Sequence, residues 1–492
     1  MVRMANRISK VLIIATIGVT IWMLSMRFQL GLTRYFDVDE YAYLHWAYQV
    51  FSGNVPYRDF FFYAPPGFLW ALAPLFAFFH GTAPFLAGRV LAVAIFSALS
   101  LIAGLLFWQV RRSWAALLVP LILIFLPLPS DKFLEIRPDT FAMLFAMVGL
   151  LFQVKWMRSA TKGSAFRGWS FLSGFFYSLS FLVLPKTLPQ VAVAVVIAVG
   201  WGIWGRKRIM PFFIGLFVPI GLFGLWAIGT GDPGIVWYSL LQLPREVGNE
   251  TAKMFPMQPD LFFYPNATYY GENGWSIGLL VNHAIWIVGL AIGALRLLTP
   301  KTWTEFLISA SLFAHVIFFF WIYPLRHAQY LIPIAVFVAW YAADFINILW
   351  YKGLNKFPTG ILITLLVGGC AGLLWIFLRV NQPKLAWDNK APLVAIGNLY
   401  AAIPFSEYLL DLDGRTIYYQ DPYYICCLPY GEFTSYMSRK LPSLIPILEQ
   451  TNTQYIYEGE LLRVNTLPPD EKNYIRTNYA PYPNIPGLLL RK

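Results

Sequence analysis

Carboxylate side chains gather around Asp39, directly after the first apolar segment of the chain. Asp37, Asp39 and Glu40 lie in the sequence Phe-Asp-Val-Asp-Glu-Tyr, and the pair Arg58–Asp59 follows shortly afterwards. A carboxylate can accept a proton from a hydroxyl group as a general base, and neighbouring carboxylates can bind a divalent cation. Simpler roles are a capping box formed by Asp37 and Glu40 and a surface ion pair at Arg58–Asp59. Charges are costly at a bilayer edge, so this stretch is the first candidate for a functional site.

Basic side chains suited to binding an anion occur in three later turns. Arg137 and Asp139 lie in the sequence Glu-Ile-Arg-Pro-Asp, Lys186 follows the fifth apolar segment, and Arg326 follows the ninth. The guanidinium fork of arginine matches the geometry of a phosphate group. These residues have simpler structural alternatives. Arg137 and Asp139 could be an ion pair that anchors the chain at the membrane interface, and Lys186 and Arg326 could be side chains that extend to the bilayer surface.

The elements that must position these residues are membrane helices. The chain is 58% hydrophobic and 13% charged, with mean hydropathy +0.57, whereas soluble domains carry about 25% charged residues. Its apolar runs are long enough to cross a hydrocarbon core of about 30 Å, and backbone groups in lipid must be satisfied within a helix. We expect eleven spans, near residues 11–30, 85–108, 113–129, 139–154, 169–185, 189–205, 210–228, 276–297, 304–322, 328–350 and 358–379.

The basic residues predict the orientation of these spans. With the N-terminus inside, the inner segments hold sixteen Lys and Arg residues, from Arg3 to Lys356, and no Asp or Glu. This asymmetry follows the positive-inside rule. The formal net charge of +12 therefore reflects membrane orientation. Because the basic residues are explained in this way, we reject a role in binding nucleic acid. We expect a multi-pass protein of the cell membrane with a cytoplasmic N-terminus and an uncleaved first span.

Two regions are expected on the outer face. The first outer loop, residues 31–84, should contain an amphipathic interfacial helix from Asp37 to Phe51 and a short apolar helix at 68–80. The tail, 384–492, should form a small α/β domain with strands at 393–396, 416–419 and 455–457 and a helix at 441–450. The fold class is therefore an all-α polytopic membrane domain, 1–383, followed by a small extracytoplasmic α/β domain, 384–492, with a binding or gating role. Adjacent Cys426 and Cys427 do not indicate a disulfide framework.

The first-loop motif resembles the GT-C superfamily of polytopic glycosyltransferases. The acidic pair after the first span, followed by Gly-Asn-Val-Pro-Tyr-Arg-Asp-Phe and Ala-Pro-Pro-Gly, is similar to the branch of protein O-mannosyltransferases, aminoarabinose transferases and bacterial RgtA/B/C/D-like enzymes. The Glu-Ile-Arg-Pro-Asp string, Lys186 and the segment from Arg326 to Pro333 support the resemblance, which covers about residues 10–350.

This resemblance implies transfer of a hexosyl- or pentosyl-type sugar from a polyprenyl-phosphate donor to a lipid, glycan or protein acceptor hydroxyl. The catalytic aspartate of the family corresponds to Asp39, with Glu40 beside it. The remaining residues of the expected site would bind substrates: Arg58, Asp59, Arg137, Asp139, Lys186 and Arg326. Lipid phosphate as leaving group needs charge stabilisation, which the cations can give. A divalent cation held by two aspartates and a glutamate is a further option.

A second hypothesis is a lipid or glycolipid transporter or flippase. A transport pathway would be expected to place charges at mid-span and to show paired, interrupted helices. The polar residues collect on one face instead, which favours chemistry at the membrane surface.

Overall fold

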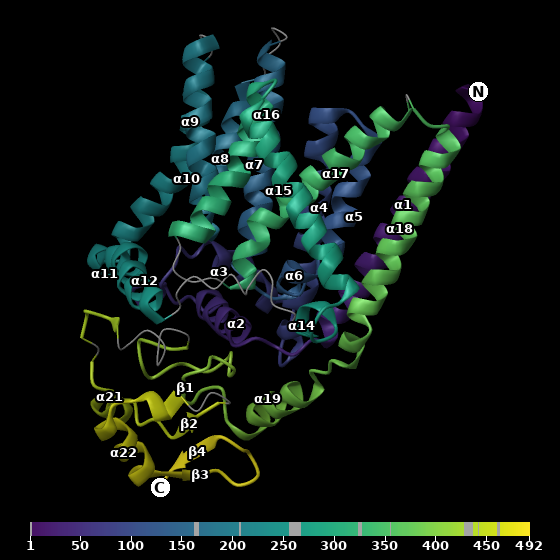
Figure 1. The fold of residues 1–492 in the computed structure, drawn as a ribbon. Helices are drawn as coiled ribbons and strands as arrows, with labels where there is room; N and C mark the ends of the chain where they lie inside the picture. The colour runs from purple at the N-terminus through teal and green to yellow at the C-terminus, as the bar shows by residue number, and fades with distance from the viewer. Residues whose placement is uncertain are drawn as a thin grey trace.

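The computed structural model describes residues 2–161, 167–205, 208–254, 267–322, 327–354, 356–427, 436–440, 442–459 and 463–492. Long helices form one bundle, and the N-terminus lies at the end of this bundle opposite the tail (Figure 1). The bundle contains α1 (Val2–Thr33), α4 (Ala83–Arg111), α5 (Leu118–Phe125), α7 (Pro138–Thr161), α8 (Arg167–Val183), α9 (Leu188–Gly205), α10 (Met210–Gly229), α15 (Ile277–Leu298), α16 (Trp303–Ile317), α17 (Ile332–Leu354) and α18 (Thr359–Asn381).

Shorter helical pieces connect the long helices. They are α2 (Val38–Phe51), α3 (Gly67–Leu72), η1 (Ala73–Ala77), η2 (Trp114–Leu117), α6 (Pro127–Ser130), η3 (Lys132–Leu134), η4 (Pro185–Thr187), α11 (Pro233–Trp237), the π-helical turn η5 (Tyr238–Gln242), α12 (Leu243–Met254), α14 (Ala267–Tyr270), the π-helical turn η6 (Phe318–Ile322), η7 (Ala328–Leu331) and η8 (Pro383–Ala386).

Within the described residues, nine helical segments are long and apolar enough to cross a membrane. Two further expected spans, 113–129 and 169–185, correspond to the shorter apolar helices Trp114–Phe125 and Gly168–Val183. The first of these is short because Pro127 follows Leu126, whose backbone has left the helical region (φ −47°, ψ 110°), as expected for a residue before proline. The polytopic helical domain expected from the sequence is thus confirmed.

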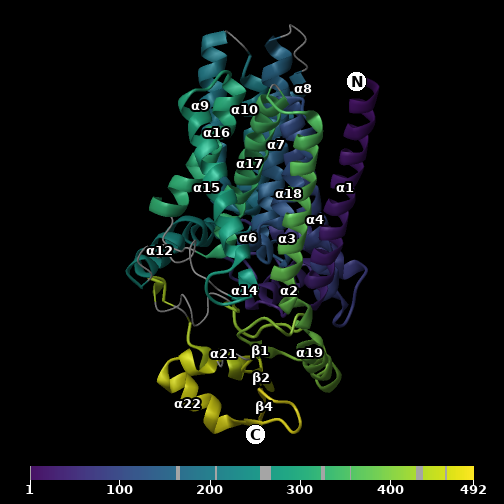
Figure 2. The same ribbon diagram turned by 45° about the vertical axis from the view of Figure 1, so that its right-hand side comes forward.

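The first outer loop and the tail lie at the same end of the bundle. Both views place α2 and α3 between the long helices and the strands of the tail (Figure 1, Figure 2). One buried apolar cluster joins Phe68 and Phe85 to Leu412 and Ile425 of the tail. The expected helix from Asp37 to Phe51 is present, but it is not an interfacial surface helix. It is buried on nearly all sides, because α3, α4 and the tail all pack against it.

The tail is a small α/β unit. Its strands are β1 (Leu409–Asp411), β2 (Tyr455–Tyr457), β3 (Tyr479–Pro481) and β4 (Leu488–Arg491), in the order β1-β2-β4-β3, with β1 and β2 parallel and the other pairs antiparallel. Its helices are α19 (Lys390–Ala402), α21 (Leu444–Gln450), η10 (Arg463–Thr466) and α22 (Pro469–Asn478).

Two of the three expected strands are wrong. Residues 393–396 belong to α19, since Ile396 and Leu399, three positions apart, are both buried on one helical face. Residues 416–419 form a turn, because the Asp411 carboxylate accepts hydrogen bonds from the backbone N–H and the hydroxyl of Thr416 at 2.7 and 2.8 Å. The strand at 455–457 and a helix within 441–450 are confirmed.

Candidate functional site

The start of α2 is fixed by a capping box and a buried ion pair. The Asp37 side chain accepts a hydrogen bond from the Asp39 backbone N–H, and Glu40 accepts one from the Asp37 N–H at 2.9 Å. Glu40 also pairs with Arg89 of α4 and accepts the Ile136 N–H at 2.8 Å. Glu40 and Arg89 have no exposed side-chain surface. Glu40 therefore joins three segments of the chain and holds Asp39 in place.

Arg137 is the centre of the charged cluster. It directly precedes α7, and its guanidinium contacts Asp39 and lies 3.5 Å from Asp37, 3.3 Å from Glu135 and 3.8 Å from Asp139. The Arg137 side chain is 7% exposed, whereas that of Asp39 is 19% exposed. One buried guanidinium thus gathers four carboxylates, of which Asp37 (25% exposed) and Asp39 (19% exposed) are the accessible ones.

Two more cations neutralise the rest of this cluster. Lys132 lies 3.3 Å from Asp37 and 2.8 Å from Glu135, and Arg34, directly after α1, lies 2.5 Å from Glu135. Lys132 belongs to the turn before α7. In this region the sequence pointed only to Arg137 and Asp139 as candidate site residues. The charges of the cluster are therefore closely balanced before any ligand binds.

Lys186 lies on the far side of Asp139. It occupies η4, with its Nζ 3.9 Å from Asp139 and 3.5 Å from the centre of the Tyr330 ring. A small cavity is lined by Asp139, Lys186 and Tyr330, together with Thr187 and His315. Asp39, Arg137, Asp139 and Lys186 thus form a continuous path of alternating charge from α2 to this cavity.

The surroundings shift the pKa values of the two first-loop aspartates in opposite directions. Burial raises the pKa of Asp39 above its usual range; Arg137 opposes this effect, and repulsion from Asp37 and Glu135 adds to it. Burial also acts on Asp37, but Arg137 and Lys132 outweigh it and lower the pKa of Asp37. A carboxylate with a raised pKa is the better proton acceptor of the two.

Two aromatic hydroxyls lie close to Asp39. The Tyr43 and Tyr63 oxygens are 3.3 Å apart, and burial with the Asp39 charge raises the pKa of Tyr43. These phenols stay protonated, so they can donate hydrogen bonds.

Not every residue expected in the site joins the cluster. Asp39, Arg137, Asp139 and Lys186 come together. Arg58 and Asp59 instead form an ion pair with each other at 2.8 Å, 54% and 31% exposed, and Asp59 accepts the Val55 N–H. Arg326 lies outside the described residues.

Several residues of this site are absent from the sequence-based selection. Arg89 had a signal in the sequence, since a lone arginine within an apolar run marks a functional or structural pair. Tyr330 lies in the segment from Arg326 to Pro333 but was not selected as a site residue. Arg34 and Lys132 had no signal, because only the fold brings them to Glu135 and Asp37.

The first-loop carboxylates do not fit a shared divalent cation. Both Glu40 oxygens are used by Arg89 and two backbone N–H groups, while Asp37 and Asp39 are oriented toward Lys132 and Arg137. Over the described ranges, the only group with metal-ligand spacing is His45 with Cys426 and Cys427, and these two sulfur atoms are bonded to each other and so are not thiolate ligands.

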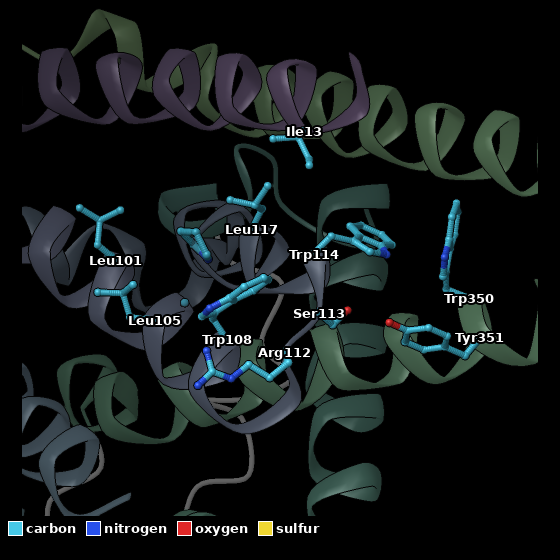
Figure 3. A pocket seen from close by; sticks show the side chains of 13 residues that line it. Ile13, Leu101, Leu105, Trp108, Arg112, Ser113, Trp114, Leu117, Trp350 and Tyr351 are labelled. Carbon is cyan, nitrogen blue, oxygen red and sulfur yellow. The ribbon is translucent and has the colours of Figure 1, made fainter. Parts of the chain in front are cut away.

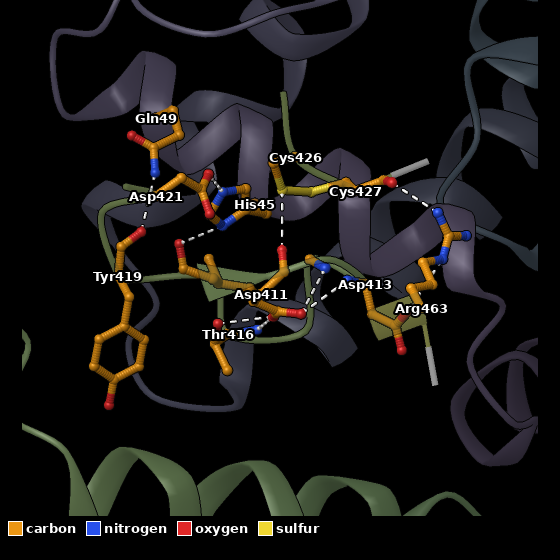
Figure 4. Close-up of a disulfide and its surroundings, with 12 residues drawn as sticks. His45, Gln49, Asp411, Asp413, Thr416, Tyr419, Asp421, Cys426, Cys427 and Arg463 are labelled. Atoms are coloured by element: carbon orange, nitrogen blue, oxygen red, sulfur yellow. Dashed lines mark hydrogen bonds and ion pairs between the residues drawn. A yellow bond between two sulfur atoms is a disulfide. The ribbon is translucent and has the colours of Figure 1, made fainter. Parts of the chain in front are cut away.

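The tail docks directly on α2 at the helix face that carries His45 and Gln49 (Figure 4). His45 binds Asp421 at 2.6 Å and faces the Ile417 carbonyl, and the Gln49 amide donates to the Tyr419 carbonyl at 3.1 Å. Cys426 and Cys427 are bonded to each other, a pairing that the expectation of no disulfide framework overlooked. The tail therefore helps to hold the helix that carries Asp39.

Comparisons with solved structures show which known fold the chain shares. No protein-family model and no curated protein matches the sequence. Among solved structures, the chain is similar to ArnT from Cupriavidus metallidurans bound to undecaprenyl phosphate, with TM-score 0.62, 12% identity, and 96% of this chain and 97% of that chain covered. It is also similar to the oligosaccharyltransferase AglB from Archaeoglobus fulgidus in complex with an inhibitory peptide and a dolichol-phosphate, with TM-score 0.52, 12% identity and coverage of 94% and 72%. Both neighbours are GT-C glycosyltransferases. The chain is thus a multi-pass membrane protein with the GT-C fold.

Proposed function

We propose that this protein is a membrane glycosyltransferase that moves a sugar from a polyprenyl-phosphate donor to an acceptor hydroxyl. The observation that carries the proposal is the path of charges from Asp39 through Arg137 and Asp139 to Lys186. It lies in a fold whose solved neighbours hold undecaprenyl phosphate and dolichol-phosphate. The partners would be this lipid-linked donor and a lipid, glycan or protein acceptor.

Asp39 is the proposed general base. Its side chain is partly exposed, and burial raises its pKa, whereas the pKa of the more exposed Asp37 is lowered. The acceptor hydroxyl would give its proton to Asp39 as its oxygen bonds to the anomeric carbon. Positioned general bases contribute about 10²–10⁴-fold to rates. Glu40 is better assigned to positioning than to catalysis, since its oxygens are already occupied by Arg89 and the backbone.

Lys186 and Arg137 are proposed to bind the lipid phosphate. As the bond between the anomeric carbon and the phosphate oxygen breaks, negative charge grows on that phosphate. Cations placed in advance around a low-dielectric site stabilise such charge strongly. Lys186 lines the cavity, and the Asp139 carboxylate keeps both cations in place. Arg326 stays a proposal on sequence grounds, whereas the geometry offers Arg58 and Asp59 no such role.

The reaction would occur on the extracytoplasmic face, with the N-terminus in the cytoplasm, as the basic inner segments predict. The geometry favours transfer over transport. At the other end of the bundle, four charged side chains pair with one another: Asp344 contacts Arg111 at 2.9 Å and Arg296 at 3.1 Å, and Glu305 contacts Arg111. Such pairs tie helices together rather than line a passage.

Transfer by purified variants tests the proposal. The wild type and the Asp39→Asn variant would be placed in liposomes with a panel of radiolabelled polyprenyl-phosphate sugars and an extract of envelope lipids and glycans. We expect the variant to lose about 10²–10⁴-fold of the rate while keeping its folded yield. Asp470→Asn, a matched change on exposed helix α22, should keep full activity. Equal transfer by Asp39→Asn and wild type would refute the role of Asp39.

A further inference from the structure

A second, larger cavity lies at the end of the bundle opposite the charged cluster. It has a volume of about 690 Å³ and lies between α1, α4, the η2–α5 segment and the end of α17. This volume is within the range of about 300–1,000 Å³ found for ligand pockets. Arg89, which pairs with Glu40, and Arg112 lie at opposite ends of α4, about 35 Å apart at 1.5 Å per residue. The cavity and the proposed transferase site therefore lie at opposite surfaces of the membrane.

The walls of the cavity are almost entirely apolar. Ile13 of α1 faces Leu101, Leu105 and Trp108 of α4 across the opening (Figure 3). Leu101 is 63% exposed, Leu105 53% and Trp108 45%. Inside a bilayer such surfaces contact lipid chains, and a hollow between helices holds a chain more closely than a convex surface does.

The polar atoms of the cavity lie along one side. Figure 3 shows Arg112 with Ser113 and Tyr351 on the side away from Ile13. Arg112 ends α4 in a left-handed conformation (φ 52°) and is exposed, and no carboxylate of the described residues pairs with it. The indole Nε1–H of Trp114 is buried without a hydrogen-bond acceptor among the described residues. A cation and an unused donor beside an apolar hollow complement an anionic headgroup with oxygen atoms.

We propose that this cavity binds an anionic membrane phospholipid. One acyl chain would lie against Leu101, Leu105 and Ile13, the phosphate would contact Arg112, and a lipid oxygen would accept the Trp114 N–H. The bound lipid would fill the space between α1 and the α4–α17 side of the bundle. It is separate from the polyprenyl-phosphate donor, whose proposed phosphate contacts lie at the other end of α4.

Lipid binding by the purified full-length protein tests this inference. Protein stripped of lipid would be titrated with phosphatidylglycerol or phosphatidylcholine and measured by native mass spectrometry. We expect a preference for phosphatidylglycerol, which Arg112→Glu reduces at least about fivefold, since one basic side chain near the headgroups contributes that factor. Leu105→Trp, which fills the hollow, should weaken both lipids. Lys155→Glu is the matched control, because Lys155 lies over Phe152 and Trp169, outside the cavity.

Three results would overturn the inference. Arg112→Glu could leave the lipid preference unchanged, Lys155→Glu could reduce it as much, or undecaprenyl phosphate could displace phosphatidylglycerol at equal concentration. Sugar transfer by Arg112→Glu should equal the wild-type rate, so a failure here is distinguishable from a failure of the transferase proposal. Trp114→Phe removes the N–H donor together with part of the aromatic surface, and it should weaken binding of both lipids without a change in folded yield.

Discussion

Replacing Arg137 by Met should make Asp39 much harder to ionise. The guanidinium contacts Asp39 directly, and it is the only cation of the described residues within ion-pair distance of that carboxylate. An opposite charge this close lowers a carboxyl pKa by about 1–3 units, each unit being about 1.4 kcal/mol. Removing Arg137 leaves burial and the repulsion from Asp37 and Glu135 unopposed. The pKa of Asp39 should therefore rise by about 1–3 units above its already raised value.

Carbodiimide labelling measures this shift without knowledge of the sugar donor. Hydrophobic carbodiimides modify protonated carboxyl groups, so the labelling rate of the peptide containing Asp39, followed by mass spectrometry across pH, gives its protonation midpoint. The wild-type midpoint should lie above the ordinary value of 3.8, and the acid limb of any transfer activity should follow it. Arg58→Met should leave the Asp39 midpoint unchanged and raise only that of Asp59. A midpoint that stays fixed or falls in Arg137→Met would refute this account of the cluster.

Three further outcomes follow from the contacts that position α2. Arg89→Met should destabilise the protein by about 3–5 kcal/mol, because it leaves the buried Glu40 charge unpaired, and adding Glu40→Gln should recover part of this loss in detergent unfolding curves; no recovery would argue against the pair. Gly67→Ala should lower the thermal midpoint, because its new Cβ would lie 2.5 Å from the Leu182 carbonyl oxygen, whereas Gly221→Ala in open space should not. Burial acts on the pKa of His45, but Asp421 outweighs it and raises that pKa above 6.5. The docking energy of the tail should thus be full below about pH 6.5 and fall as pH rises through the raised value; His45→Gln should remove this dependence in protease-sensitivity assays, and an unchanged pH profile would contradict it.

The helices of the bundle were predictable because their signal is local. An apolar run of about 20 residues identifies a span without knowledge of its neighbours. The capping box at Asp37 and Glu40 was also readable, since both partners lie in one turn of helix. Pro127 is visible in the sequence and interrupts the third expected span, 113–129, whose helix α5 ends at Phe125.

The features that the sequence missed depend on contacts between distant segments. Tail residues near position 420 supply part of the burial of α2, and no local pattern shows that the tail returns to cover this helix. Residues 393–396 and 416–419 are rich in strand-forming types, but the first packs one helical face and the second is held in a turn by Asp411. Arg58–Asp59 matched a motif, yet these two side chains pair with each other and not with the Arg137 cluster.

Photocrosslinking of the donor lipid tests most directly whether the charged cluster is the site of transfer. Undecaprenyl phosphate with a diazirine on its first isoprene unit would be bound to the full-length protein, irradiated, and located by peptide mass spectrometry. We predict crosslinks to the segments of Lys186 and Tyr330, beside the proposed phosphate contacts, and their loss in Lys186→Met. Crosslinks confined to the Arg112 and Trp114 end of the bundle, or unaffected by Lys186→Met, would contradict the account.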